Sequence, residues 1–349
     1  MALSWTARYL VDWADVRPER AGIEHEQAYL AGADEFAQLG TPLEFASLYL
    51  TAKCHLSCVH CHAEGSFQGT GPAGDVTTST LLDVIYRLGQ VARRIQLTGG
   101  EIFVRRDPGT GKNDVPLLVR AISALHREPI LQTTGIGLTP ESTAFYARHG
   151  VKWAALSLDG PSPALNAIIR GREAAFASTL KAIDLCKQAG ISVKIGTVVT
   201  RLTLDTAAFF ELGDLLEKRG VDVWKLMHFY PREAGRASAS NADALAIEPG
   251  QFRSLLGALR ERYAGSEMAI ADHDLDTFRN SPALLVQPTG IVTVTKGDAD
   301  IPLGNLLTMS RDQMLAAFLG SAPAINENLR NTYRERRLCG HRERRYWRR

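Results

Sequence analysis

The chain has 349 residues, of which 45% are hydrophobic and 22% are charged, a composition typical of a globular protein with a sizeable core. Its net charge of +2 gives no indication of nucleic-acid binding. No apolar run approaches the roughly 20 residues that a membrane helix needs, and the N-terminus carries early acidic residues instead of a signal-peptide core. These features predict a cytoplasmic protein without membrane association.

Strands and helices are predicted to alternate along the central part of the chain. Glycine closes several of the predicted helices, since it accepts the left-handed conformation beyond a helix end. The predicted strands span 45–51, 94–98, 129–134, 151–158, 191–199 and 221–229. The predicted helices between them span 77–92, 114–126, 139–149, 172–189 and 204–219.

This alternation predicts parallel strands joined by right-handed crossovers. Periodicity alone leaves open whether the sheet closes partly into a barrel or stays doubly wound. We expect a largely helical N-terminal extension over 1–44, a core over 45–234, and a C-terminal cap and basic tail over 235–349. Within the last part, the pattern predicts a helix over 249–263, a hairpin over 287–298 and a helix beginning near Ser310.

Three of the five cysteines form the motif Cys54-x3-Cys58-x2-Cys61, directly after the first predicted strand. An odd count with one tight group argues against a disulfide framework and favours a reducing compartment. The end of a strand in a parallel α/β fold is where ligands bind. Three thiolates would leave one iron of a [4Fe–4S] cluster open for a further ligand. A zinc site completed by His55, His60 or His62 is the alternative on spacing alone.

Two further motifs follow later strands. Gly99-Gly100-Glu101 comes after the second, where two glycines allow close approach of a ligand and a carboxylate can accept from an ammonium group. Ser157-x-Asp159-Gly ends the fourth, and Arg170 follows about ten residues later. Arginine suits a carboxylate ligand because its fork donates two parallel hydrogen bonds.

Together these motifs resemble the radical S-adenosylmethionine (SAM) superfamily over about residues 45–231. The resemblance implies one [4Fe–4S] cluster, SAM bound at its open iron, and an electron donor such as flavodoxin or ferredoxin. The cluster ligands implied are Cys54, Cys58 and Cys61, and the SAM-binding residues implied are His60, Gly99, Gly100, Glu101, Ser157, Arg170, Val198 and Met227. Together with the alternation of strands and helices, the resemblance implies a partial (β/α)6 TIM-like barrel with an N-terminal helical extension and a small C-terminal α/β cap.

The pattern departs from the family in two places. Ile102 stands where many members have proline, and Thr295 stands near the position of an auxiliary-cluster cysteine in peptide maturases with a SPASM or twitch domain. We therefore expect a single cluster, with Cys186 a small apolar helix residue. A late cluster ligand or a thiol that contacts substrate is the alternative role for Cys339. The arginine-rich segment 330–349 is expected to be a solvated or frayed terminal helix, and a patch for an acidic substrate, a phosphate or a partner protein is the alternative.

The predicted reaction is reductive cleavage of SAM to a 5′-deoxyadenosyl radical, which abstracts hydrogen from a carbon of the substrate. The resemblance favours a ribosomal precursor peptide that is crosslinked or epimerised. A small biosynthetic intermediate, such as a sugar, nucleoside or amino acid, is the alternative, and a zinc-binding interaction module is the alternative from another class. His228 and Tyr230, at the end of the sixth strand, are candidates for substrate binding or proton transfer.

Overall fold

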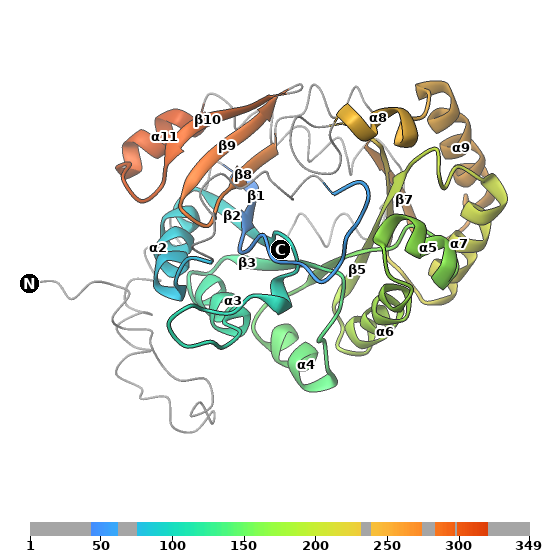
Figure 1. Cartoon of the computed structure of the whole chain (residues 1–349). Helices are drawn as coiled ribbons and strands as arrows, with labels where there is room; N and C mark the ends of the chain where they lie inside the picture. The colour runs from blue at the N-terminus through green and yellow to red at the C-terminus, as the bar shows by residue number, and fades with distance from the viewer. Residues whose placement is uncertain (1–42, 62–74, 232–238, 274–282, 297–298, 320–349) are drawn as a thin grey trace, which may run out of the picture.

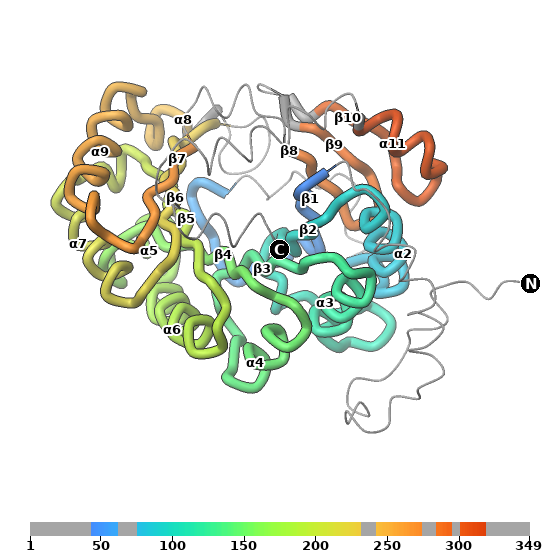
Figure 2. Tube along the Cα trace, turned by 180° about the vertical axis from the view of Figure 1, so that it is seen from behind, coloured from blue at the N-terminus to red at the C-terminus, as the bar shows by residue number. Residues whose placement is uncertain are grey.

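One curved sheet of ten strands, with helices along its convex face, organises the computed structural model (Figures 1 and 2). The structure describes residues 43–61, 75–231, 239–273, 283–296 and 299–319. The strands are β1 (Leu43–Tyr49), β2 (Ala92–Thr98), β3 (Glu128–Thr133), β4 (Trp153–Ser157), β5 (Ser192–Val199), β6 (Val223–His228), β7 (Ala269–His273), β8 (Ala283–Val286), β9 (Ile291–Lys296) and β10 (Ala299–Asn305). Their order is β10-β9-β8-β1-β2-β3-β4-β5-β6-β7.

Short capping signals explain where the helices begin. Thr77 accepts a hydrogen bond from the Thr80 N–H at the start of α2, and Thr139 with Ser142 forms a capping box at the start of α4. Gly150 follows α4 with φ of +83°, as predicted. The helices are α2 (Thr78–Gly89), η3 (Ile102–Val104), α3 (Val115–Ala124), α4 (Pro140–Arg148), α5 (Pro163–Arg170), α6 (Ala174–Gln188), α7 (Thr206–Lys218), α8 (Ala239–Leu245), α9 (Pro249–Arg262) and α11 (Arg311–Leu319).

The six predicted strands are present and neighbouring ones pair in parallel, which confirms a mixed α/β fold with a parallel sheet. The C-terminal third differs from the expected separate cap. β7 extends the parallel sheet beyond β6, and β8 pairs in parallel with β1 at the other side before the hairpin to β9. The predicted boundary at residues 234–235 therefore does not coincide with a break in the sheet.

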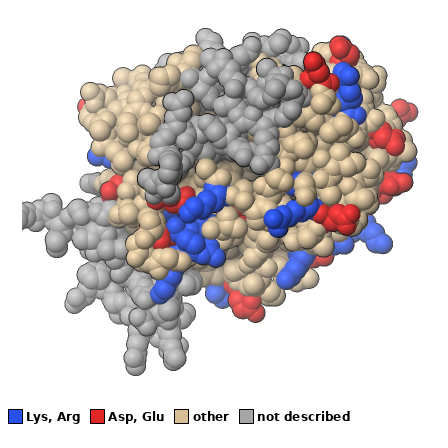
Figure 3. Space-filling view, in the orientation of Figure 1, with Lys and Arg blue, Asp and Glu red and all other residues tan. Residues whose placement is uncertain are grey.

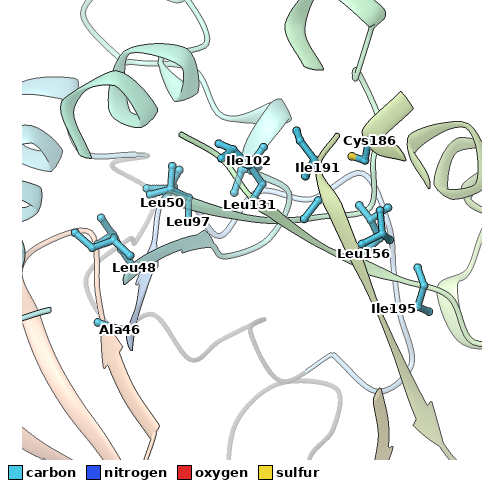
Figure 4. Packing of buried hydrophobic residues seen from close by; sticks show 14 of the residues in the cluster. Ala46, Leu48, Leu50, Leu97, Ile102, Leu131, Leu156, Cys186, Ile191 and Ile195 are labelled. Carbon is cyan, nitrogen blue, oxygen red and sulfur yellow. The ribbon is translucent and has the colours of Figure 1, made fainter. Parts of the chain in front are cut away.

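The two faces of the sheet differ in composition. Leu48, Leu97, Leu131, Leu156 and Ile195 lie on successive strands and pack under the helices (Figure 4). Because side chains alternate along a strand, the residues between them point to the opposite, concave side. We call this concave side the inner face.

One predicted helix is shorter than expected. The predicted helix over 172–189 is α6, and α5 precedes it as a separate helix. Gly171, at φ of +76°, ends α5 in the left-handed conformation. The predictions for residues 1–42 and for the arginine-rich segment lie outside the described residues.

Charged side chains of both signs are mixed on the face that Figure 3 shows. Figure 3 shows Lys and Arg groups beside Asp and Glu groups on this face, in keeping with the small net charge. Among the described helices, none has the length and apolar character required to cross a membrane.

Candidate functional site

The cysteine loop, residues 51–61, follows β1 at the carboxyl ends of the parallel strands. Cys54 is exposed, Cys58 is buried and Cys61 is part-buried, and the charges of the three thiol groups act on one another. A zinc ion would draw its sulfur ligands to about 3.8 Å from each other. No three Cys, His, Asp or Glu side chains in the described part of the chain are gathered in that way. The three thiol groups therefore lie on one loop and are near enough for their charges to act on one another.

The beginning of the loop is held by backbone hydrogen bonds from the Gly-Gly-Glu turn. The Gly100 N–H donates to the Thr51 carbonyl at 2.8 Å, and the Glu101 N–H donates to the Lys53 carbonyl at 2.8 Å. The Thr51 hydroxyl donates to Asp75 at 2.6 Å, and Lys53 pairs with the same carboxylate at 3.1 Å. The position of Cys54 is thus set by residues from three segments.

The two glycines are required by this contact with the loop. A Cβ at Gly99 would lie 2.5 Å from the Thr51 carbonyl oxygen, and Gly99 has φ of +134°. A Cβ at Gly100 would lie 2.2 Å from the Lys53 carbonyl oxygen. Close approach of a ligand was the predicted reason for these glycines, and the structure adds the close approach of the cysteine loop itself.

Glu101 is fully buried and its carboxylate is surrounded by donors. Oε1 accepts from the Thr133 hydroxyl at 2.5 Å and the Phe103 N–H at 3.2 Å. Oε2 accepts from the Thr134 N–H at 2.7 Å and the Thr134 hydroxyl at 2.6 Å. A carboxylate has about four acceptor positions. Glu101 therefore joins the loop to the end of β3. An ammonium group could bind the carboxylate only by replacing one of these donors or by sharing an acceptor oxygen with it.

The second half of the loop is held by α5. The Val59 N–H donates to the Ile169 carbonyl at 2.9 Å, and Arg170 Nη1 lies 3.8 Å from Cys58 Sγ. A Cβ at Gly171 would lie 2.4 Å from Ser57 Oγ, so the loop also packs directly on the end of the helix. Burial raises the pKa of the Cys58 thiol, while the Arg170 guanidinium acts in the opposite direction.

A buried carboxylate stands behind this contact. Asp159 forms an ion pair with Arg170, lies 3.4 Å from His60 Nε2, and accepts from the Val198 N–H at 2.8 Å. Burial alone would raise the pKa of Asp159. The Arg170 charge, with help from His60 and Val198, instead lowers it to about 2. Arg170 has five donors, so these contacts leave donors for a further ligand.

The other predicted SAM-binding residues lie on the inner face or beside the loop. Ser157 is the last residue of β4. Because the neighbouring Leu156 belongs to the outer core, alternation along the strand places Ser157 on the inner face. Val198 packs with Val59 in a small apolar cluster, which brings the end of β5 to the loop. Met227 pairs with Val198, and its Cε lies 3.1 Å from where a Cβ on Gly196 would stand.

His228 does not share that placement. The centroids of the His228 ring and the Phe252 ring of α9 lie 5.2 Å apart, and the rings meet edge-on. Alternation along β6 places His228 on the same face as Trp224 and Leu226, which belong to the outer core. This packing directs the ring towards α9 and away from the inner face, and a role of His228 in substrate binding or proton transfer stays a prediction. Tyr230 lies two residues beyond β6 and is part-buried, and its role stays a prediction.

The comparisons with known proteins fall on this same region. A sequence model described as the radical SAM superfamily matches residues 48–212. Residues 48–212 of this chain belong to the radical SAM superfamily.

Two curated relatives are similar to the central part of this radical SAM protein. An AdoMet-dependent heme synthase from Oleidesulfovibrio alaskensis is 30% identical over 202 residues, covering 57% of this chain and 48% of the relative. A mycofactocin maturase, MftC, from Mycolicibacterium smegmatis is 30% identical over 193 residues, covering 51% and 46%. The chain spans about half the length of the curated relatives it matches.

Solved structures share the fold. The structure of Streptococcus suis SuiB bound to the precursor peptide SuiA has a TM-score of 0.61 at 14% identity, covering 86% of this chain and 69% of that chain. At this identity the likeness concerns the fold alone. It supports assignment of the curved parallel sheet to the partial barrel of radical SAM proteins.

Superfamily membership implies a [4Fe–4S] cluster and SAM. It also removes the zinc-module alternative. Among the described residues, Cys186 is buried in α6 and burial raises its pKa to about 12, as fits a structural thiol. Cys339 lies outside the described residues, and Thr295 lies in β9.

Sequence reasoning missed the partners that hold the two motifs of this radical SAM protein. The sequence predicts Thr133 and Thr134 only as the end of a strand, and it gives Asp159 only as a member of the motif that begins at Ser157. A signal for the threonines existed, since polar residues at the end of a parallel strand lie beside those of the neighbouring strand. The ion pair between Asp159 and Arg170 had no comparable signal.

Proposed function

We propose that this protein is a radical SAM enzyme that cleaves SAM reductively and abstracts hydrogen from a carbon of an organic substrate. The arrangement of the cysteine loop carries the proposal. Both motifs of the superfamily, Gly99–Glu101 and Ser157–Arg170, contact the loop or lie at the strand ends around it. The proposed core spans 45–234, and residues 235–349 add β7 to β10 to its sheet. We propose that 1–44 precede this core as an extension and that the protein is cytoplasmic.

Each residue has a part in this proposal that its position supports. Cys54, Cys58 and Cys61 would hold the cluster, which supplies the electron for SAM cleavage when bound. Arg170 and Ser157 would orient the SAM carboxylate or ribose, and the turn at Gly99–Glu101 would receive its amino group. Val198, Met227 and the backbone near His60 would border the adenine, since they meet at the ends of β5, β6 and the loop.

The test uses anaerobically purified protein reconstituted with iron and sulfide. We expect about four irons per chain and release of 5′-deoxyadenosine on addition of SAM and dithionite. Cys58→Ala should lose iron and cleavage, while Cys186→Ala, which removes a buried thiol outside the loop, should keep both. A colourless protein with one zinc, or cleavage retained by Cys58→Ala, would contradict the proposal.

Two substrate classes follow from the relatives. A precursor peptide is favoured by the maturase relative and by the Ser-x-Asp-Gly element at Ser157–Gly160. A small biosynthetic intermediate is favoured by the heme synthase relative and by the absence of cysteines between 187 and 338 for auxiliary clusters.

A deuterium-transfer assay separates the two classes. A deuterated extract of the source cells is divided into peptide and small-molecule fractions, and each is incubated with the enzyme, SAM and dithionite. The fraction that transfers deuterium into 5′-deoxyadenosine contains the substrate. Loss of the transfer after protease treatment identifies a peptide.

A further inference from the structure

Three polar side chains form a hydrogen-bonded row on the inner face of β1, β2 and β3. The row consists of Ser47, Gln96 and Gln132, one residue on each strand. Each stands next in the chain to a leucine that packs under the helices, these being Leu48, Leu97 and Leu131 (Figure 4). Strand alternation therefore turns the three polar residues to the concave side. We call them the amide row.

The hydrogen bonds of the amide row run through Gln96. Its Nε2 lies 3.3 Å from Ser47 Oγ and 2.5 Å from Gln132 Oε1. Ser47 and Gln96 are buried, with 8% and 6% exposure, whereas Gln132 is exposed. On the β4 side, Gln132 pairs with Ala155, whose small side chain does not reach over the amide. Gln132 is thus the member of the row that a molecule on the concave side can contact.

Gln96 also sets the direction of the Gln132 amide. The two protons of the Gln96 NH2 group face two acceptors, the Ser47 hydroxyl and the Gln132 carbonyl oxygen. Because Gln132 uses its oxygen for this bond, its own NH2 group is turned away from Gln96. Within the part of the chain that the structure describes, neither the Gln132 NH2 group nor the Gln96 carbonyl oxygen has a hydrogen-bond partner. One donor and one acceptor therefore stand ready on adjacent amides.

A donor beside an acceptor is complementary to an amide group, which has a carbonyl that accepts and an N–H that donates. A carboxylate has acceptors only, so it would meet the lone pairs of the Gln96 oxygen. The row itself carries no charge. Two residues before Gln96, Arg94 pairs with Glu128 at 3.3 Å, so opposite charges face each other there. The chemistry of the row thus favours a neutral amide over an ion.

The amide row lies just below the turn that holds the cysteine loop. Gln132 is two residues before Thr134, whose N–H and hydroxyl donate to the Glu101 carboxylate. Two residues of a strand span roughly 7 Å. A group bound at Gln132 would therefore lie a short distance inside the end of β3, and the rest of its molecule could extend towards the proposed SAM site.

We propose that Gln132, positioned by Gln96 and Ser47, binds an amide group of the substrate. This inference rests on the proposed radical SAM function, because the substrate is the molecule from which hydrogen is abstracted. The amide can be a peptide-backbone amide, or a primary amide of a side chain or a small molecule. In each case a row that is already oriented loses little conformational freedom when the amide binds.

The experiment measures binding of three small probes to the reconstituted, oxidised protein by saturation-transfer difference NMR. N-acetylalanine methylamide represents a peptide backbone, propionamide represents a primary amide, and propionate is a carboxylate of the same size as propionamide. Propionate is included because Lys194 lies two strands from Gln132, roughly 10 Å between Cα atoms. Each titration is repeated with SAM in the absence of a reductant.

The variants separate the donor of Gln132 from the rest of the row. Gln132→Leu removes the whole amide. Gln132→Glu keeps an oxygen for the bond from Gln96 and replaces the NH2 group with a second oxygen. Gln188→Leu makes the same change as the first variant at the exposed end of α6 and is the matched control. Circular dichroism checks that each variant is folded.

We expect at least one amide probe to bind the wild type more tightly than propionate, and to bind Gln132→Leu about fivefold or more weakly than wild type. Gln132→Glu should also weaken binding, because a carboxylate cannot donate to a carbonyl, and Gln188→Leu should bind as wild type does. Binding of N-acetylalanine methylamide alone indicates a peptide backbone, and binding of propionamide alone indicates a primary amide.

Four results would overturn the inference. They are absence of saturable amide binding to the wild type, equal affinities for wild type and Gln132→Leu, tighter binding of propionate than of either amide, and displacement of the amide by SAM. The last result would assign Gln132 to the SAM site.

A separate measurement distinguishes this inference from the proposed function. SAM cleavage by the wild type with dithionite is measured without any probe. If iron is present and no 5′-deoxyadenosine forms, the proposed function fails, and with it the assignment of the bound amide to a substrate. If cleavage proceeds and amide binding does not depend on Gln132, only the inference about the amide row fails.

Discussion

The two ends of the cysteine loop are held by different kinds of interaction. At the first end, near Cys54, Gly100 and Glu101 donate neutral backbone hydrogen bonds to the loop. At the second end, near Cys58, the contact is to Arg170, whose charge is balanced by the buried Asp159. Both ends approach a glycine closely, but only the second end contacts a buried ion pair, that of Asp159 with Arg170.

This difference determines which substitutions each end tolerates. A close backbone contact at a glycine is disrupted when any side chain is added there, because the new Cβ overlaps the opposite backbone. The charge of that side chain makes little difference. A buried ion pair fails when one charge is removed, because the remaining charge is left without compensation. Stability measurements on single variants can therefore test the two ends separately.

The largest effect is expected at the second end. Asp159→Ala leaves Arg170 buried and unbalanced, and we expect a loss of about 3–5 kcal/mol in the free energy of unfolding. Asp184→Ala is the control, since Asp184 pairs with Arg219 on the surface, where such a pair contributes at most about 1 kcal/mol. Urea unfolding measures both. Similar losses in the two variants would show that the Asp159–Arg170 pair does not stabilise the loop.

A smaller loss is expected where Glu101 joins the first end to β3. Glu101→Gln turns an amide NH2 towards donors from Thr133 or Thr134, and we expect a loss of about 2–3 kcal/mol even without cofactors. Glu211→Gln, on the exposed side of α7, should stay within about 0.5 kcal/mol of wild type. An unchanged stability of Glu101→Gln would instead favour a role confined to ligand binding.

Gly100→Ala tests the steric requirement of the first end directly. Its Cβ would overlap the Lys53 carbonyl oxygen, and we expect a loss of about 1–3 kcal/mol together with reduced iron content after reconstitution. Gly257→Ala lies in α9 with no atom within 4 Å of the new Cβ and should stabilise the protein by up to about 1 kcal/mol. Full iron content in Gly100→Ala would show that the loop does not need this close contact.

The smallest effect concerns the thiols themselves. In protein without iron, Cys54 should react with iodoacetamide before Cys58, because Cys54 is exposed and Cys58 is packed against Arg170. Asp159→Ala should narrow the difference in rate by loosening the second end. Peptide mass spectrometry over time gives both rates. Equal labelling of the two thiols in wild type would contradict the asymmetry between the ends.

Local patterns in the sequence predicted much of the fold. Glycines such as Gly150 and Gly190 marked helix ends, and the apolar alternation between them located six strands. The position of the three cysteines after the first strand located the candidate site. These features depend on neighbouring residues, so the sequence contains them directly.

The remaining features depend on residues far apart in the chain. β8 pairs with β1 across more than 200 residues, and no short-range pattern encodes such a partner. Asp159 and Arg170 both belong to predicted motifs, but their ion pair depends on how α5 returns to the sheet. The side of the sheet on which His228 lies could have been predicted, because His228, Leu226 and Trp224 are spaced two residues apart along one strand and so share a face. What the sequence did not state was which face packs under the helices.

The strand order also sets a mechanical limit on the sheet. β7 ends at His273, and β8, on the other side of the seven parallel strands, begins at Ala283. The ten steps between successive Cα atoms from His273 to Ala283 can span at most about 36 Å, even when the chain is fully extended. The covalent chain thus tethers the two sides of the curved sheet to each other. The distance between the end of β7 and the start of β8 therefore has an upper bound that is independent of any hydrogen bond in the sheet.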